Sequence, residues 1–265
     1  MSLTIGVLKE TVSGETRVAL TPEIAKKFIS LKANVIMERG AGELSNQIDG
    51  DYDGVEFTDR NQVLKKCDLL LTVQPISPED SNELNQSSYV VGMVFGHLNK
   101  KTVQSLLNKK HTSFAMELMP RISRAQSMDV LSSQAAASGY QAVLIAASTL
   151  DKFFPMLTTA AGTIRPAQVL VIGAGVAGLQ AIATAKRLGA IVKGYDVRSA
   201  TKEQIESLGA KFIDTGVSAD GEGGYARELT KEEKAKQQQI LEDEIANCDV
   251  LISTAAVPGK PAPRI

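Results

Sequence analysis

The chain has 265 residues, 43% of them hydrophobic and 22% charged, and its formal net charge at pH 7 is -1. This length can supply two hydrophobic cores, so we expect two domains. A nearly neutral chain is not expected to bind nucleic acid as its main partner, and no apolar run reaches the length of a membrane span, so we expect a soluble protein.

The two cysteines, Cys67 and Cys248, lie far apart in the sequence, and neither has histidines at metal-ligand spacing beside it. We therefore expect no metal site. Both cysteines are interpreted as buried thiols in a reducing compartment.

Short apolar runs alternate with helix signals through the first half of the chain. Thr21, Pro22 and Glu23 supply an N-cap, a proline at the first helical position and an early acid, which predict a helix to about residue 31. Strands are predicted at residues 4–8, 34–38, 67–73, 89–94 and 112–116, with another helix at 101–108. This alternation predicts a parallel α/β sheet. No turn in this half carries a glycine triplet, so we expect no dinucleotide site there.

Polar residues gather after a break at Pro120. The group comprises Arg121, Arg124, Gln126, Asp129, Ser132, Ser133 and Gln134. Clefts form at hinges between a scaffold domain and a cofactor domain, but a solvated helix face with local capping explains the pattern equally well. A long helix is predicted from about residue 128. We expect one domain over residues 1–137, ending in this hinge and linking helix, and a second over residues 138–265.

The most informative stretch, residues 169–196, predicts a strand, a glycine turn, a helix and a second strand. Four apolar residues, 169–172, indicate a strand buried on both faces. Gly173, Gly175 and Gly178 then form G-x-G-x-x-G. The first glycine permits a sharp turn, the second lets a pyrophosphate approach the backbone, and the third lets the helix pack close to the sheet. The phosphates would lie at the helix N-terminus, where N–H groups and the helix dipole attract anions.

Asp196 follows the next predicted strand, residues 191–195. It lies about 20 residues after the glycines, where a carboxylate accepts hydrogen bonds from the adenosine ribose hydroxyls. A 2′-phosphate placed there would meet a like charge, so NAD(H) is expected rather than NADP(H). Arg198 shares a face with Asp196 in an extended chain, and we expect it to pair with the acid or to remain solvated. Glycine turns also serve packing alone, but strand, triplet, helix and acid in this order favour dinucleotide binding.

Beyond Asp196 the sequence predicts further parts of the same domain. The expected elements are a helix at 201–208, a strand at 210–213, a helix that begins at the capping box of Thr230 and Glu233, and a strand at 249–253. The glycine-rich segment 214–228, with Tyr225 near its end, is either a lid over the cofactor or a disordered surface connection. Residues 158–162 are expected to be a small-residue loop able to lie against a flat ring. A six-stranded doubly wound domain needs more strands than these, so we expect it to be incomplete at the C-terminus.

These motifs together resemble the NAD(H)-binding domain, or alpha subunit, of proton-translocating NAD(P) transhydrogenase, in the alanine dehydrogenase/transhydrogenase superfamily. The likeness extends over nearly all 265 residues. It rests on KE-x6-RVA from Lys9 to Ala19, on MELMPRISRAQSMDVLSSQ, on GAGVAGLQAIATAKRLGA with DVR after it, and on GGYA and AAVPGKPAP near the end. The PRISRAQS block is far more specific than the glycine triplet.

The resemblance implies two Rossmann-like, doubly wound parallel-sheet domains that take part in direct hydride transfer from NADH to NADP+, coupled to proton translocation. Arg121, Gln126, Asp129 and Ser132 would hold the nicotinamide end of NAD(H), the first three as the catalytic group. Gly173, Gly175, Gly178 and Asp196 would hold the pyrophosphate and the adenosine ribose, and Tyr225 would be the tip of a mobile loop. Hydride exchange between two nicotinamides needs no general acid or base, so positioning is the main requirement.

The resemblance also implies partners. They are a second copy of the chain in a homodimer, a domain that binds NADP(H), and a membrane-spanning subunit. The chain would then be cytoplasmic and peripheral to the inner, or plasma, membrane through its partner subunits.

Two other functions remain open from the sequence. Alanine dehydrogenase belongs to the same superfamily, and Arg17 and His97 sit where that enzyme has its carboxylate-binding arginine and its histidine. Gln74, however, stands where its lysine is expected. The third reading is a non-catalytic NAD-sensing module, which would bind the cofactor tightly without turnover.

Overall fold

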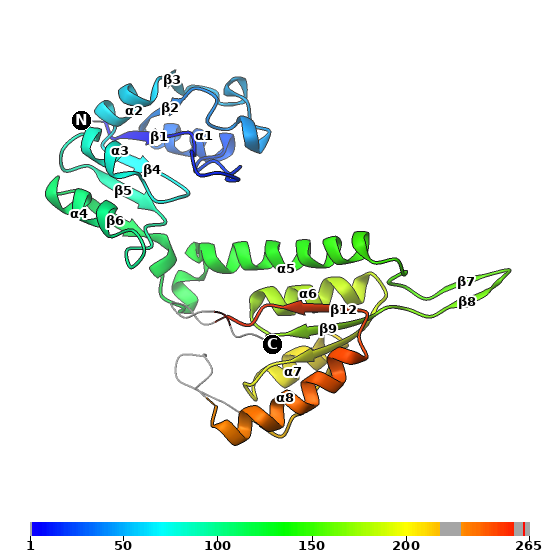
Figure 1. The fold of residues 1–265 in the computed structure, drawn as a ribbon. Coiled ribbons are helices and arrows are strands. Elements are labelled where there is room, and N and C mark those ends of the chain that lie inside the picture. The colour runs from blue at the N-terminus through cyan, green and yellow to red at the C-terminus, as the bar shows by residue number, and fades with distance from the viewer. Residues whose placement is uncertain (1, 218–228, 257–261, 263–265) are drawn as a thin grey trace. The chain divides into compact units, whose positions relative to one another are not determined.

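The computed structural model describes residues 2–217, 229–256 and 262 (Figure 1). The chain divides into two compact units, Met1–Val130 and Leu131–Ile265. The expected domain boundary at residues 137 and 138 falls inside helix α5, Val130–Thr149. The linking helix therefore runs past that boundary and belongs, after its first residue, to the C-terminal unit.

A six-stranded parallel sheet forms the centre of the N-terminal unit, with the strand order β3-β2-β1-β4-β5-β6. The strands are β1 (Thr4–Val7), β2 (Asn34–Glu38), β3 (Glu56–Thr58), β4 (Leu69–Leu71), β5 (Tyr89–Gly92) and β6 (Thr112–Ala115). The helices are α1 (Pro22–Ser30), α2 (Arg60–Lys66), α3 (Pro78–Glu83) and α4 (Lys100–Asn108). Short 3-10 helices span Glu43–Ser45, Asp49–Asp51, Met116–Leu118 and Ser123–Met128. The predicted parallel α/β fold is confirmed, and the order is that of a doubly wound sheet.

Both faces of this sheet are covered, because alternate residues of its strands enter different hydrophobic clusters. In β2, Val35 and Met37 pack in one cluster, while Ile36 packs in the other. This alternation follows from the two-residue period of a strand. Cys67 is fully buried on the same side as Ile36, and burial raises the pKa of its thiol to about 12. Cys248 is only half-buried.

The C-terminal unit has a four-stranded parallel sheet in its described part, with the order β11-β10-β9-β12. The strands are β9 (Gln168–Ile172), β10 (Ile191–Tyr195), β11 (Lys211–Phe212) and β12 (Val250–Ser253). The helices are α5, α6 (Val176–Arg187), α7 (Thr201–Ser207) and α8 (Lys231–Ala246). The predicted capping box is present, since Thr230 Oγ1 accepts from Glu233 N and Glu233 Oε2 from Thr230 N.

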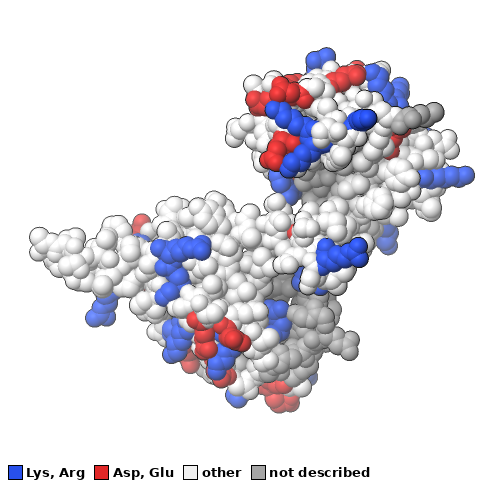
Figure 2. All heavy atoms as spheres, turned by 180° about the vertical axis from the view of Figure 1, so that it is seen from behind, with Lys and Arg blue, Asp and Glu red and all other residues white. Residues whose placement is uncertain are grey.

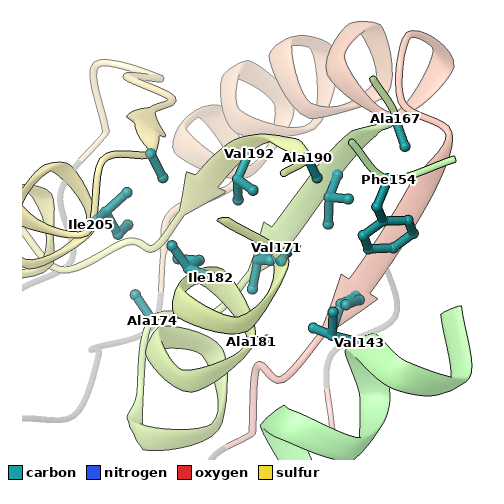
Figure 3. Packing of buried hydrophobic residues seen from close by; sticks show 14 residues of the cluster. Val143, Phe154, Ala167, Val171, Ala174, Ala181, Ile182, Ala190, Val192 and Ile205 are labelled. Carbon is teal, nitrogen blue, oxygen red and sulfur yellow. The ribbon is translucent and has the colours of Figure 1, made fainter. Parts of the chain in front are cut away.

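Helices cover both faces of this second sheet as well. Val171 and Val192 face Ile182 of α6, and Val143 of α5 and Ile205 of α7 belong to the same cluster (Figure 3). On the opposite face, other strand residues pack with Leu241 of α8. The sheet is thus enclosed between α5, α6 and α7 on one side and α8 on the other.

An antiparallel hairpin, β7 (Leu157–Thr159) and β8 (Gly162–Ile164), projects away from the second sheet (Figure 1). The expectation of a loop lying against a cofactor ring is wrong for this segment. The hairpin lies just before the amino end of β9, whereas ligands of parallel sheets bind beyond the carboxyl ends. Its strands are largely exposed and too short to show an alternating pattern.

Gly139 determines how closely α5 approaches the cofactor helix. A Cβ atom built on Gly139 would lie 2.1 Å from the carbonyl oxygen of Ala177, in the first turn of α6. Such a contact is far inside van der Waals distance, so a side chain there requires the main chain of one helix to move. The absence of a side chain at Gly139 therefore holds α5 against the start of α6.

We expect Gly139→Ala to lower the free energy of unfolding by about 1–3 kcal/mol, as overpacked core substitutions do. At an open helix position the same change stabilises by roughly 1 kcal/mol, because alanine is the better helix former. Urea unfolding followed by circular dichroism measures the difference, and Ser138→Ala at the exposed neighbouring position is the matched control. A more stable Gly139→Ala variant would contradict the close packing described here.

Candidate dinucleotide site

The carboxyl ends of β9 and β12 border a crevice in the second sheet. From β9 the chain proceeds to β10 and β11 on one side, and it returns to the other side with β12. Such a change of direction opens a ligand crevice at the carboxyl ends of the strands. Thr254, directly after β12, crosses this point: its N–H donates to Ile172 O at 2.8 Å, and its Oγ1 donates to Gly173 O at 2.8 Å. Thr254 therefore supports the glycine turn from the neighbouring strand.

The three glycines of the turn stand in different surroundings. Gly173 has a φ of +95°, and a Cβ there would lie 2.7 Å from Ala255 N. A Cβ on Gly178 would lie 1.7 Å from the carbonyl oxygen of Gly173. Gly175 has an ordinary φ of -78°, and no heavy atom of the described residues lies within 4 Å of a Cβ built on it. The protein's own packing requires the first and third glycines, while the second borders open space.

That open space adjoins the N-terminus of α6. Gly175 is the N-cap residue and supplies no side chain to cap the helix, whose first internal bond runs from Leu179 N to Gly175 O at 2.9 Å. The first N–H groups of a helix have no acceptor within it, and together with the helix dipole they attract an anion. A dinucleotide pyrophosphate fits this place by charge and by the space over Gly175.

Asp196 lies directly after β10 and holds the turn from its other side. Its Oδ2 accepts the N–H of Ala174 at 2.7 Å, and its side chain is only 8% exposed. Arg198 pairs with it, which is one of the two outcomes expected from the sequence. Burial raises the pKa of Asp196, but hydrogen bonds from Arg198 and Ala174 outweigh this and hold it below the ordinary value. The carboxylate is thus charged and fixed at the place where a ribose would bind.

The hinge residues lie in a short stretch on both sides of the division between the units. Arg121 and Gln126 are exposed, and Asp129, which ends the 3-10 helix Ser123–Met128, is half-buried. Ser132 lies in the first turn of α5, seven residues before Gly139, so the two share a face of the helix. Gly139 packs against α6, so Ser132 lies on the face of α5 turned towards the helix that follows the glycine turn.

The structure brings together the predicted adenosine-side residues, Gly173, Gly175, Gly178 and Asp196. Arg121, Gln126 and Asp129 belong to the N-terminal unit, and Ser132 belongs to the C-terminal unit. Tyr225 lies outside the described residues. Sequence reasoning missed Ala174 and Thr254. Both positions had a signal, since one lies inside the glycine turn and the other follows the last predicted strand by one residue.

The corresponding crevice of the N-terminal unit is filled by the chain itself. It lies between β1 and β4, where Glu10 accepts hydrogen bonds from Val73 N at 2.6 Å and Gln74 N at 3.3 Å. Burial raises the pKa of Glu10 more than these hydrogen bonds lower it. A carboxylate of the protein thus takes the place that a ligand's anionic group takes in other doubly wound sheets.

A second carboxylate beside this crevice covers Arg17. Glu15 accepts from Arg17 Nε at 2.7 Å and Arg17 Nη2 at 2.6 Å, and the side-chain amide of Gln74 donates to it at 2.6 Å. The hydrogen bonds from Arg17 lower the pKa of Glu15 to about 2. His97 is exposed in the turn after β5. The guanidinium of Arg17 is therefore already paired with an acid of the protein.

Within the described ranges, no three His, Cys, Asp or Glu side chains are grouped so that they could hold a metal ion. The same stretches of the chain include no helix that combines the length and apolar character needed to cross a membrane.

Two family models match the two halves of the chain. The alanine dehydrogenase/PNT N-terminal domain matches residues 6–138, and the alanine dehydrogenase/PNT C-terminal domain matches residues 142–265. The chain belongs to the alanine dehydrogenase/PNT family. Its members include both kinds of enzyme considered from the sequence, so individual relatives decide between them.

The transhydrogenase relatives are much more similar than the alanine dehydrogenases. An NAD(P) transhydrogenase alpha subunit of Rhodospirillum rubrum is 47% identical, over 98% of this chain and 71% of its own length. The crystal structure of transhydrogenase from Sinorhizobium meliloti superposes with a TM-score of 0.86 at 42% identity, over 99% of this chain and 72% of that one. Alanine dehydrogenase of Mycolicibacterium smegmatis is 27% identical, over 98% of this chain and 67% of its own length. The resemblance to the transhydrogenase is confirmed.

We expect Gly175→Ala and Gly178→Ala to have opposite effects. The first adds a methyl group where the described chain has no atoms, so it should fold normally and lose roughly tenfold or more in NADH affinity. The second places Cβ against Gly173 O, so it should lower the free energy of unfolding by at least about 1–3 kcal/mol. Thermal melting and NADH fluorescence titration separate the two. Wild-type NADH affinity in a folded Gly175→Ala variant would show that the ligand does not use this space.

Proposed function

We propose that this chain is the NAD(H)-binding component of a proton-translocating NAD(P) transhydrogenase. A hydride passes directly between the nicotinamide of NAD(H), held here, and that of NADP(H), held by a partner subunit or domain. One observation carries the proposal: a glycine turn with open space over Gly175 is tied to the buried carboxylate of Asp196, in a chain nearly half identical to transhydrogenase alpha subunits.

NAD(H) supplies the hydride, and the residues of this chain bind and orient it. The glycine turn receives the pyrophosphate at the N-terminus of α6, and Asp196 receives the adenosine ribose. Arg121, Gln126, Asp129 and Ser132 hold the nicotinamide end. The amide of Gln126 can donate and accept hydrogen bonds without titrating, which suits a reaction that needs no proton transfer at the reacting carbons.

The arrangement around Arg17 weighs against alanine dehydrogenase activity. A carboxylate substrate would have to displace Glu15, which binds Arg17 through two short hydrogen bonds. Gln74 carries no charge to grip a keto oxygen, and its amide is also directed to Glu15. A free amino acid could therefore engage either side chain only by breaking its present bond to Glu15.

The proposal extends to partners and location. The chain works as a homodimer, beside an NADP(H)-binding domain and a membrane-spanning subunit that keep it at the cytoplasmic side of the inner membrane. Dimer formation is supported by apolar surface on the C-terminal unit. Tyr140 and Ile145 of α5, and Phe153 and Met156 before β7, are exposed. Residues 157–164 contain no charged side chain, the projecting tip of the hairpin is uncharged in Figure 2, and a lone two-stranded hairpin is marginally stable in water.

Hydride transfer tests the proposed function directly. The chain mixed with a purified NADP(H)-binding partner should oxidise NADH in step with reduction of an NADP+ analogue. Gln126→Asn shortens the side chain by one methylene, so it should slow transfer by about tenfold or more with NADH affinity nearly unchanged. Gln104→Asn, on the exposed face of α4, is the matched control. NADH formation from NAD+ and alanine, without transfer to the partner, would support the dehydrogenase instead.

Light scattering on a sizing column tests the dimer. The wild-type chain should elute at about twice its mass of 28.3 kDa. Ile145→Lys places a charge on the exposed apolar side of α5 and should shift the equilibrium towards the monomer, while Leu107→Lys on α4 of the other unit should not. A monomeric wild type at micromolar concentration would contradict this aspect of the proposal.

A further inference from the structure

The Asp196 carboxylate has its acceptor positions filled by the protein itself. Oδ1 accepts from Arg198 N at 3.0 Å and from Arg198 Nε at 2.9 Å. Oδ2 accepts from Ala174 N at 2.7 Å and from Arg198 Nη2 at 2.8 Å. A carboxylate offers about four lone-pair positions, so a ribose hydroxyl can bind here only by taking one of them from a present donor.

The Arg198 side chain is the donor that a ribose can replace. Ala174 and Arg198 also donate through main-chain N–H groups, which the turn and the strand end hold in place. The guanidinium sits on a side chain that is 26% exposed and can rotate outwards. Arg198 also has the planar fork of donors that binds phosphate well, and an arginine near this position accommodates the 2′-phosphate in NADP-binding domains.

We propose that Arg198 is a specificity residue: a ligand for a 2′-phosphate that Asp196 holds out of use. This inference rests on the proposed binding of NAD(H) at the glycine turn. With NAD(H), the ribose hydroxyls share Asp196 with the guanidinium, which stays beside the acid. With NADP(H), the phosphate meets the Asp196 charge and can gain Arg198 only by breaking the pair, which leaves a buried carboxylate uncompensated. Rejection of NADP(H) therefore belongs to the pair and not to the acid alone.

The test measures NADH and NADPH affinity by fluorescence titration of the intact chain in four forms: wild type, Asp196→Asn, Arg198→Ala and the double variant. Asparagine keeps an oxygen for the Ala174 N–H and removes the charge. Asp196→Asn should bind NADPH at least about tenfold more tightly than wild type, because the released guanidinium gains a charge-assisted contact with phosphate. Arg198→Ala should still reject NADPH, since Asp196 keeps its charge.

The double variant decides the role of Arg198. It should lose most of the NADPH affinity gained by Asp196→Asn, whereas Asp196→Asn combined with Lys202→Ala should keep it. Lys202 is an exposed cation on the neighbouring helix α7, so it controls for a general loss of positive charge. If Asp196→Asn does not fold, as judged by circular dichroism, Asp196→Ser replaces it in the same series.

Equal NADPH affinity of Asp196→Asn with and without Arg198 would overturn the inference. NADPH binding by Arg198→Ala alone would overturn it as well, since the acid would then not be the barrier. The wild-type titration reads the proposed function separately: a wild type that binds NADH while the variants ignore Arg198 rejects only this inference. A wild type that does not bind NADH rejects both.

Discussion

The dinucleotide crevice depends on a buried carboxylate that fixes the glycine turn from the side. Asp196, at the end of β10, accepts the N–H of Ala174, and Thr254, after β12, donates to the carbonyl of Gly173. Three strand ends are thus joined at one point, and the absence of a side chain on Gly178 lets α6 begin directly above it. Without the carboxylate, the Ala174 N–H would lose its acceptor, which costs about 1–3 kcal/mol for a buried donor.

The two units share a strand order but treat the crevice differently. In each, the chain changes direction beside the first strand, and a crevice opens at the carboxyl ends. Glu10 fills the crevice of the N-terminal unit and bonds to the main chain after β4. In the C-terminal unit the equivalent space, over Gly175, contains no atoms of the described residues. The same architecture therefore supports a closed scaffold in one half and an open site in the other.

Much of this could be predicted from the sequence where local chemistry decided the structure. Strands β2 and β10 begin and end at the predicted residues, because both are apolar runs with clear ends. Helix α3 was missed although Ser77 caps it and Pro78 follows, a signal that was present but not used. Strand β3 and the hairpin β7–β8 could not be predicted, since three-residue strands with little burial carry no periodicity. The pairing of Asp196 with Arg198 was foreseen only as one alternative, because spacing does not reveal which side-chain rotamer is adopted.

The bond from Asp196 to Ala174 also bears on the thermodynamics of association. It joins the strand end that receives a ribose to the turn that receives a pyrophosphate, so both subsites already have their bound geometry in the free protein. Ordering entropy is among the main costs of binding, and a preorganised half-site spares most of it. The adenosine half of the cofactor is then the anchor, and its favourable free energy is available to orient the reactive ring at the opposite end.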